Sequence, residues 1–272
     1  MQRLTIDVDG VATSYLSAGD PADPVVLMIH GTFWSRVWQP VLDDVAAAGL
    51  YCVAVDLPGL GHSDGELTVE TASVPALAGW VERFADALGI AGPVGVAAHD
   101  IGGGIAQHLM VHGNIGVSHL ALLNAVMYDS WPVPAVARYR DPAVAAATTH
   151  EELVAARRIA ITRCLDRAAT PVRVEEYLAP WLQARVARNW IALAAAADNR
   201  YTQALVPALR ESQIPKLLIW GEDDPFQQVE HAERFAREMP HARLVRIPHA
   251  CHFPAENDPE AVAKALREFF RP

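Results

Sequence analysis

Cysteine, positive charge and long apolar runs are all scarce in this sequence. The three cysteines, Cys52, Cys164 and Cys251, are odd in number and far apart, as expected for reduced thiols. The formal net charge of −10 argues against nucleic acids and anionic membranes as partners, because both need a basic surface. No apolar run approaches the about 18 residues that a membrane-spanning helix needs.

Targeting signals and nucleotide-binding motifs are missing as well. Residues 1–10, MQRLTIDVDG, lack the basic and apolar regions of a secretion signal, which predicts a cytoplasmic protein. The chain has no P-loop and no G-x-G-x-x-G motif, and we expect no cofactor. We expect a small molecule and water as partners, and a monomer or a homodimer. The alanine-rich composition, with arginine in excess of lysine, suggests a bacterial chain.

Strand patterns alternate with helix patterns along most of the chain. Residues 4–8 and 11–16 flank an Asp-Gly pair and predict a hairpin of two antiparallel strands at a sheet edge. The later strands are apolar runs separated by helix patterns, which indicates a parallel sheet with both faces covered. These expected strands are residues 25–29, 51–55, 94–98, 117–124, 216–220 and 243–247.

The alternation stops before the last two expected strands. Residues 128–209 have helical and turn composition with proline breaks, and they hold four of the six tyrosines. This pattern favours a helical insertion over a linker. The sequence therefore predicts a core domain made of residues 1–127 and 210–272, and a helical cap made of residues 128–209.

Residues 93–113 contain the pattern on which the functional reading depends. An apolar strand ends in the run from Ala98 to Gly102, AHDIG, and a helix pattern follows at once. A G-x-S-x-G elbow needs small residues on both sides, because its strained turn lifts the central side chain above the sheet. Here the small residues are Ala98 and Gly102, and the central side chain is Asp100 where an esterase would carry serine. The alternative is that Asp100 only caps the following helix.

A carboxylate at this turn indicates chemistry at saturated carbon. A serine attacking such a carbon would leave an ether, which water does not cleave under enzymatic conditions. Asp100 would leave an alkyl ester whose carbonyl lies on the protein, where an activated water can hydrolyse it. A serine-type esterase is disfavoured, because the elbow has no serine and Ser35 and Ser63 lie on other loops.

Several polar residues directly follow apolar strands, and they are His30, Asp56, Asp100, Asp224 and His252. In an open parallel sheet the carboxyl ends of the strands share one edge, where ligands bind. A nucleophile, an acid and a histidine come in the chain order Asp100, Asp224, His252. With the motifs HG, DLPGLGHSD and G-x-x-D in sequence, the chain resembles the α/β-hydrolase superfamily over nearly its whole length. Its elbow, HDIGG, resembles the branch of epoxide hydrolases and haloalkane or haloacetate dehalogenases.

The resemblance implies a fold and a set of roles. The fold would be an α/β-hydrolase fold, a mostly parallel twisted sheet flanked by helices, with a helical cap inserted before the last two strands. Asp100 would be the nucleophile, His252 the base that activates water, and Asp224 the acid that orients the imidazole. The backbone N–H groups of Thr32 and Ile101 would form the oxyanion hole.

Neighbouring residues compete for two of these roles. Asp223 precedes Asp224, and the G-x-x-D spacing favours Asp224. His249 precedes His252, which is favoured because a bulky residue and an acidic turn follow it. His249, Cys251 and His252 lie in one short turn without a fourth ligand at a known spacing, so we expect no metal site.

The choice of leaving group depends on hydrogen-bond donors. In epoxide hydrolases cap tyrosines supply an acid to the ring oxygen, whereas dehalogenases hold the halide with N–H donors, often a tryptophan directly after the nucleophile. Because that position is Ile101 here, we predict an epoxide hydrolase, with a dehalogenase as the alternative in which Trp34 supplies the indole N–H. Tyr177 and Tyr201 are the candidate acids. An apolar pocket is expected, and its candidate substrate contacts are His30, Phe33, Trp34, Tyr177, Trp181, Trp190 and Tyr201.

A second alternative is an inactive hydrolase fold that serves as a ligand-binding protein, since a fold does not guarantee a function. The presence of Asp224 and His252 argues against it, because a pocket that only binds has no need of this acid and base.

Overall fold

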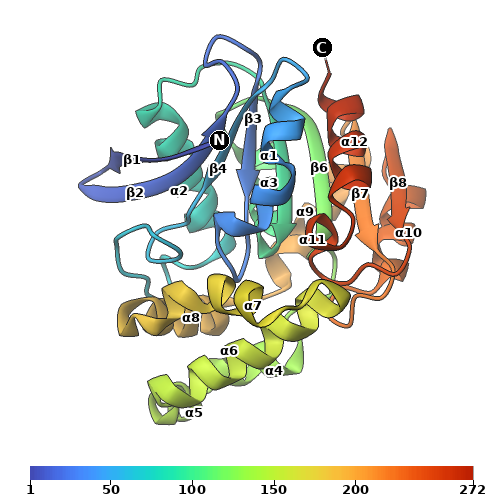
Figure 1. Ribbon diagram of the computed structural model, residues 1–272. Helices are drawn as coiled ribbons and strands as arrows, with labels where there is room; N and C mark the ends of the chain where they lie inside the picture. The colour runs from blue at the N-terminus through green and yellow to red at the C-terminus, as the bar shows by residue number, and fades with distance from the viewer. Residues whose placement is uncertain (272) are drawn as a thin grey trace.

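The computed structural model describes residues 1–271, which form one mixed sheet with helices on both faces (Figure 1). The strand order is β1-β2-β4-β3-β5-β6-β7-β8. β2 runs antiparallel to both of its neighbours, and every pair from β4 to β8 is parallel. The strands are β1 (Gln2–Val8), β2 (Val11–Ala18), β3 (Val25–Ile29), β4 (Tyr51–Val55), β5 (Val94–Asp100), β6 (Val117–Ala125), β7 (Lys216–Gly221) and β8 (Ala242–Ile247). The predicted fold class and the hairpin at the sheet edge are confirmed.

Local sequence explains these strands. The β1–β2 hairpin turns at Asp9 and Gly10, whose φ angles of 54° and 83° are those that Asp-Gly hairpin turns need. The central strands β3 and β5 are almost wholly buried, because helices cover both faces of the sheet there. Continuous apolar runs suit such positions, whereas a strand with one solvated face would alternate.

Helices cover the two faces in separate groups. α1 and α12 pack against each other on one face, and α2, α3 and α9 pack in succession on the other (Figure 1). α10 packs against β7 and β8, and the short α11 precedes α12. These helices are α1 (Gln39–Ala46), α2 (Val74–Ala87), α3 (Ile101–His112), α9 (Arg200–Glu211), α10 (Val229–Glu238), α11 (Pro254–Asn257) and α12 (Pro259–Phe270), with a 3-10 turn, η1 (Ser35–Trp38), before α1.

A further helical layer lies below the sheet in Figure 1. Its members are α4 (Pro134–Ala137), α5 (Pro142–Ala147), α6 (His150–Leu165), α7 (Pro171–Leu178) and α8 (Ala184–Ala196), with the 3-10 turns η2 (Arg138–Arg140), η3 (Asp166–Ala168) and η4 (Ala179–Leu182). We call α4–α8 and these turns the cap helices. α9, which falls inside the range 128–209, packs against α3 instead. The division of the chain into a core and a cap domain stays a prediction.

Buried polar side chains join the cap helices to the rest of the molecule. In α8 the amide of Asn189 donates through Nδ2 to the carbonyls of Gly59, at 2.9 Å, and Gly65, at 3.1 Å. Its Oδ1 accepts a hydrogen bond of 2.9 Å from the N–H of Leu67. One side chain therefore fixes the loop after β4 to the cap helices.

The carboxylate of Glu256 makes a second connection between the cap helices and the rest of the molecule. Glu256, in α11, accepts hydrogen bonds from Arg36 Nη1 at 2.6 Å and from the Tyr177 hydroxyl at 3.0 Å. It also pairs with Arg173 Nε at 3.2 Å. Arg173 and Tyr177 belong to α7, so this cluster links η1 and α11 to the cap helices. In residues 1–271 no helix combines the length and the apolar character needed to cross a membrane.

Candidate active site

Asp100 is the last residue of β5 and stands at a strained turn. Its φ of 55° and ψ of −130° lie outside the regions that residues other than glycine commonly adopt. The turn is also crowded: a Cβ on Gly102 would lie 2.5 Å from the carbonyl oxygen of Ile29, and one on Gly31 would lie 2.6 Å from Asp100 Oδ2. Glycine is needed at both positions so that strand, loop and helix can approach this closely.

Thr32 holds one oxygen of the Asp100 carboxylate. Its backbone N–H donates to Oδ2 at 2.8 Å and its hydroxyl donates to the same oxygen at 2.7 Å. Burial raises the pKa of Asp100, but the charges of His252 and His99 and the two hydrogen bonds from Thr32 outweigh burial, so the pKa is lowered. Asp100 is therefore ionised, and within residues 1–271 all hydrogen bonds to its carboxylate reach Oδ2, which leaves Oδ1 for a reaction.

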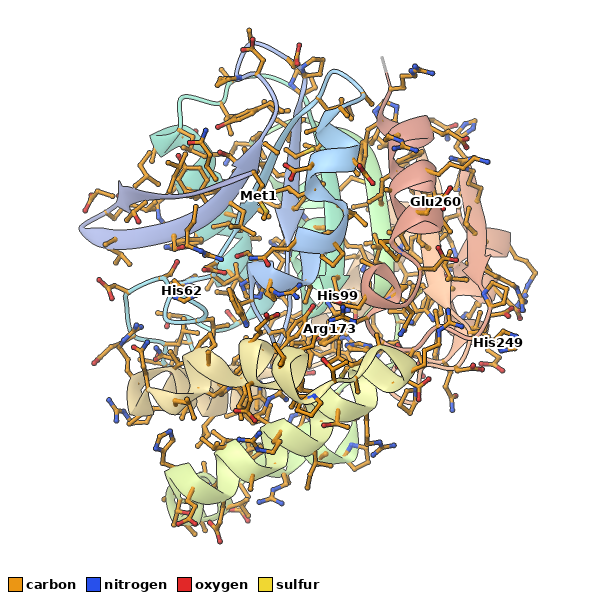
Figure 2. The ribbon with its side chains drawn as sticks, viewed as in Figure 1. Met1, His62, His99, Arg173, His249 and Glu260 are labelled. Carbon is orange, nitrogen blue, oxygen red and sulfur yellow. The ribbon has the colours of Figure 1, made fainter. Side chains whose placement is uncertain are left out.

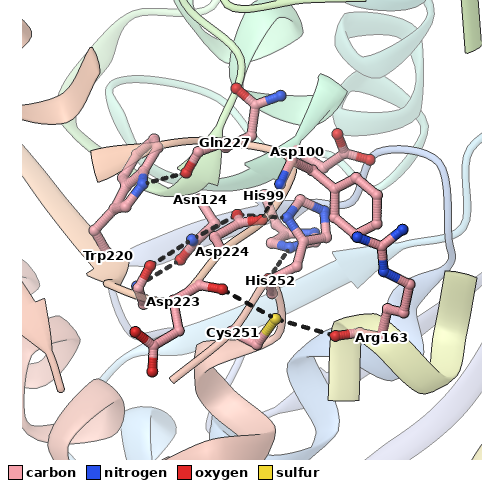
Figure 3. Close-up of polar contacts among 12 residues, drawn as sticks. His99, Asp100, Asn124, Arg163, Trp220, Asp223, Asp224, Gln227, Cys251 and His252 are labelled. Atoms are coloured by element: carbon pink, nitrogen blue, oxygen red, sulfur yellow. Dashed lines mark hydrogen bonds and ion pairs between the residues drawn. The ribbon is translucent and has the colours of Figure 1, made fainter. Parts of the chain in front are cut away.

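Asp224 and His252 form a buried acid and base pair (Figure 3). Nδ1–H of His252 donates to Asp224 Oδ2 at 2.8 Å, and Asn124 Nδ2 donates to the same oxygen at 2.7 Å. The N–H of Phe226 donates to Oδ1 at 2.7 Å. Burial lowers the pKa of His252, but the negative charges of Asp224 and Asp100 raise it by more, and the net pKa is raised. With Nδ1 engaged, Nε2 is the nitrogen left to activate water.

The competing residues lie elsewhere. Asp223 is exposed, and its carboxylate points away from His252 in Figure 3. His249 is exposed at the edge of the molecule near β8 (Figure 2). Across the described chain, no group of three or more His, Cys, Asp and Glu side chains could hold a metal ion.

His99 is buried next to His252. Its Nε2–H donates to the backbone carbonyl of His252 at 2.8 Å, and the two ring centroids are 4.7 Å apart. Burial, and then the charge of His252, lower the pKa of His99 to about 4. His99 is therefore neutral, and it positions the backbone of His252.

A cavity of about 180 Å³ lies between this sheet edge and the cap helices. Asp100, His252, Thr32 and Ile101 line it from the sheet side. Since a cavity of about 150 Å³ takes up benzene, this one suits a small molecule. The cap side of the lining is mostly apolar and aromatic, and it includes Trp131, Val136, Tyr139, Leu153, Ala156, Arg157, Ala160 and Trp190.

Of the predicted substrate contacts, Phe33 and Trp190 line the cavity, and the others do not. His30 is fully buried: its Nε2 accepts from the N–H of Leu57 at 2.9 Å and its Nδ1–H donates to the Gly31 carbonyl at 2.9 Å. The expectation that His30 contacts substrate is thus corrected, because both ring nitrogens hold the loops after β3 and β4.

The indole of Trp34 is also occupied, so the structure corrects its predicted role. Its Nε1–H donates to the Tyr177 carbonyl at 3.1 Å and is not available to a halide. Trp181 is buried at the back of Phe33, with ring centroids 6.0 Å apart. Both tryptophans therefore support the wall of the cavity without lining it.

Neither candidate acid faces the cavity, which is a further correction. Tyr177 stacks on Phe253 and its hydroxyl donates to Glu256. Tyr201 belongs to α9, and its hydroxyl accepts a hydrogen bond of 2.9 Å from Arg200. The cavity contains a different cap tyrosine, Tyr139, whose hydroxyl has no hydrogen-bond partner within residues 1–271.

Sequence reasoning missed four features of the site: the Thr32 hydroxyl, Asn124, Tyr139 and Arg157. Asn124 is a polar residue at the end of an apolar strand, the same signal that singled out the other site residues. Arg157 lies in α6 four residues from both Leu153 and Ile161, a spacing that puts it on their apolar face. Tyr139 lies in a short 3-10 turn, where the sequence carries no such signal.

Comparisons with known proteins identify the family of the chain. A family model described as "Alpha/beta hydrolase family" matches residues 26–265. Epoxide hydrolase 3 from Xenopus tropicalis is 23% identical, over 96% of this chain and 75% of that protein. A haloalkane dehalogenase from Mesorhizobium japonicum is 26% identical, over 97% of this chain and 90% of that protein.

Of two further similarities, one shows the fold alone and the other covers only part of the relative. The crystal structure of a haloalkane dehalogenase from Bradyrhizobium elkani USDA94 has a TM-score of 0.83 and 22% identity, with 99% of this chain and 97% of that chain covered, and this likeness shows the fold. A dihydrolipoyllysine-residue acetyltransferase component of the acetoin cleaving system from Cupriavidus necator is 39% identical over 122 residues. The match spans 31% of that protein's length.

Proposed function

The chain belongs to the alpha/beta hydrolase family, and from this premise we propose that it hydrolyses a small epoxide by nucleophilic attack of Asp100 on a ring carbon. The observation that carries this proposal is the state of the carboxylate. Oδ2 is held by both donors of Thr32, while Oδ1 is left free in a cavity that His252 also lines.

In the first step Oδ1 of Asp100 attacks the carbon and the ring C–O bond breaks. The electron pair of that bond goes to the ring oxygen, which needs a proton as it leaves. Tyr139 lines the same cavity and its hydroxyl has no partner within the described residues, so it is the acid that we assign. It replaces Tyr177 and Tyr201, whose hydroxyls are engaged outside the cavity.

In the second step water attacks Cγ of the Asp100 ester. Nε2 of His252 takes the proton, and Asp224 stabilises the imidazolium. Negative charge develops on Oδ2, which already accepts hydrogen bonds from Thr32. Ester formation also removes the charge of Asp100, one of the charges that raise the pKa of His252, and this loss favours the neutral, basic form of the imidazole. The Cγ–Oδ1 bond then breaks, and the departing alkoxide, which carries Oδ1, takes the proton from the imidazolium of His252. The product is a diol, the oxygen of the attacking water stays in the Asp100 carboxyl group, whose proton is lost to solvent, and Tyr139 recovers its proton from solvent.

Dehalogenation is the second candidate, and one observation favours it. Trp190 lines the cavity, and its indole Nε1 is buried without a partner in the described part of the chain. An unpaired N–H of this kind could hold a departing halide. One relative is named as an epoxide hydrolase and another as a haloalkane dehalogenase, and both are aligned over nearly all of this chain.

The test is the mass of a trapped intermediate. His252→Gln should still be alkylated at Asp100 but should not hydrolyse the ester, so its intact mass is recorded after incubation with epoxides and with organohalides. An increment equal to the whole epoxide supports epoxide hydrolysis, whereas an increment equal to the organohalide less HX selects dehalogenation.

Two controls make this test decisive. Peptide mapping must place the adduct on Asp100, and the double variant with Asp100→Asn must remain unmodified. An adduct on another residue contradicts the mechanism. Ester hydrolysis that survives Asp100→Asn would also overturn it, and an unmodified His252→Gln protein together with an inactive wild type favours a binding-only protein.

A further inference from the structure

Arg157 is a buried cation in the cavity that the mechanism above does not use. It lies in α6, is 6% exposed and lines the cavity together with Asp100. Burial lowers the pKa of Arg157 to about 10, so the side chain is still charged at neutral pH.

The hydrogen-bonding capacity of this guanidinium is almost unused. Of its five N–H donors, Nη2 makes one long hydrogen bond of 3.4 Å, to the Thr32 carbonyl, and Nε is buried without a partner in the described chain. Aromatic rings surround it: the distances from Cζ to the ring centroids are 4.5 Å for Phe33, 4.9 Å for Trp181 and 4.7 Å for Trp190. Rings stack on a guanidinium, but they do not satisfy its N–H groups.

A buried charge is normally paired, because removing it from water is costly. Asp100 is the carboxylate in the cavity, and its charge acts on Arg157. That carboxylate, however, loses its charge when the ester forms. An anion supplied by the substrate would keep Arg157 paired through that step.

We propose that Arg157 binds a carboxylate group of the substrate and so presents the neighbouring carbon to Asp100. This inference rests on the proposed function and names its substrate class: small epoxides that carry a carboxylate next to the attacked carbon. A planar guanidinium matches a carboxylate with two parallel hydrogen bonds, which fixes orientation as well as position.

The position of Arg157 indicates that it binds a substituent of the attacked carbon and not the leaving group. Its hydrogen bond goes to Thr32, the residue that also holds the Asp100 carboxylate. A leaving group must depart on the side of the carbon opposite to Asp100 Oδ1. A guanidinium beside the nucleophile can hold a group attached to the attacked carbon.

The kinetic test compares oxirane-2-carboxylate with its neutral counterpart, oxirane-2-carboxamide. We expect wild type to prefer the acid, and Arg157→Gln to lower kcat/KM for the acid by roughly 10- to 100-fold more than it lowers kcat/KM for the amide, the usual effect of losing hydrogen bonds between charged groups. Arg158→Gln is the matched control, since the neighbouring Arg158 is exposed and pairs with Glu175. An equal loss on both substrates, or a preference of wild type for the amide, overturns the inference.

Binding provides a readout that does not need chemistry. In Asp100→Asn protein, propanoate should quench the fluorescence of the tryptophans that stack on Arg157, and propanamide should not. Carboxylate binding without turnover of any epoxide contradicts the proposed function alone. Turnover of neutral epoxides without propanoate binding contradicts this inference alone, and that result can be obtained even if Arg157→Gln does not fold.

Discussion

The Thr32 hydroxyl connects the two chemical steps of the proposed mechanism. It donates to Oδ2 of Asp100 at 2.7 Å, and the backbone N–H of Thr32 donates to the same oxygen. Before attack this hydrogen bond stabilises the carboxylate and makes it less nucleophilic. After attack the same oxygen belongs to the ester carbonyl, and the hydroxyl stabilises the charge that develops there.

Removing this hydroxyl should therefore affect the two steps differently. For Thr32→Val we expect ester hydrolysis to slow about a hundredfold, the usual cost of one oxyanion donor, with alkylation unchanged or faster. The alkylated protein should accumulate, which rapid quenching and intact mass can measure.

Thr32→Ser is the matched control, because it keeps the hydroxyl and should hydrolyse the ester at close to the wild-type rate. If Thr32→Val slows alkylation and hydrolysis by the same factor, the hydroxyl only shapes the loop and the assigned role is wrong.

The arginines of α6 show at the residue scale how tertiary position decides function. Arg157 and Arg158 are adjacent and chemically identical, and yet one is buried in the cavity while the other is exposed. A rotation of about 100° between neighbouring residues of a helix separates their environments. Residue type alone does not distinguish an arginine that lines a cavity from one on the surface.

At the scale of a single element, α3 depends on its first glycine. A Cβ at Gly102 would lie 2.5 Å from the carbonyl oxygen of Ile29 and 2.7 Å from that of His30. The start of α3 therefore packs directly on the backbone at the end of β3, and this contact aligns the turn that carries Asp100.

We expect Gly102→Ala to lower the free energy of unfolding by roughly 1 to 3 kcal/mol, because α3 must move away from β3 to accommodate the methyl group. The measurement is urea unfolding followed by circular dichroism.

Gly79→Ala in α2 is the control, since its Cβ would meet its nearest neighbour, Arg83 Nη1, at 3.6 Å. Alanine there should stabilise the protein by about 0.5 to 1 kcal/mol through its higher helix propensity. Equal effects of the two substitutions would show that the close packing of α3 has no energetic consequence.

At the scale of the whole molecule, the cavity exists because the cap helices are held over the sheet edge. Glu256 is central to this attachment: its side chain is 3% exposed and is joined to Arg36, Arg173 and Tyr177. These partners come from segments more than 75 residues away from Glu256 in the chain.

Glu256→Gln should lower the free energy of unfolding by about 3 kcal/mol, because it removes the buried counter-charge of Arg36, whose side chain is 13% exposed. We also expect faster proteolysis within the cap helices. Thermal unfolding and limited proteolysis measure the two effects.

A second carboxylate that pairs with Arg36 provides the control for this change. Arg36 also pairs with Glu176 at 3.0 Å, but the Glu176 side chain is 51% exposed, so Glu176→Gln should change stability by no more than about 0.5 kcal/mol. Similar losses for both variants would mean that Glu256 makes no special contribution to holding the cap helices.

The sequence by itself determined the sheet, because the local patterns of apolar and turn residues indicate where each strand begins and ends. Expected strands 25–29 and 51–55 coincide with β3 and β4, and the hairpin at the edge was expected from its Asp-Gly turn. Since parallel strands bring their carboxyl ends to one edge, the order of motifs also predicted that Asp100, Asp224 and His252 would meet. The family is confirmed by a model that covers most of the chain.

Only the tertiary structure decided which cap side chains reach the cavity. Tyr177 and Tyr201 have the right chemistry but lie elsewhere, while Tyr139, Trp190 and Arg157 line the space beside Asp100. The physical reason is that the apolar pattern of a helix shows which of its faces is buried but not which part of the molecule that face meets. The side chains that face the cavity are therefore set by contacts with distant segments of the chain, such as those of Asn189 and Glu256.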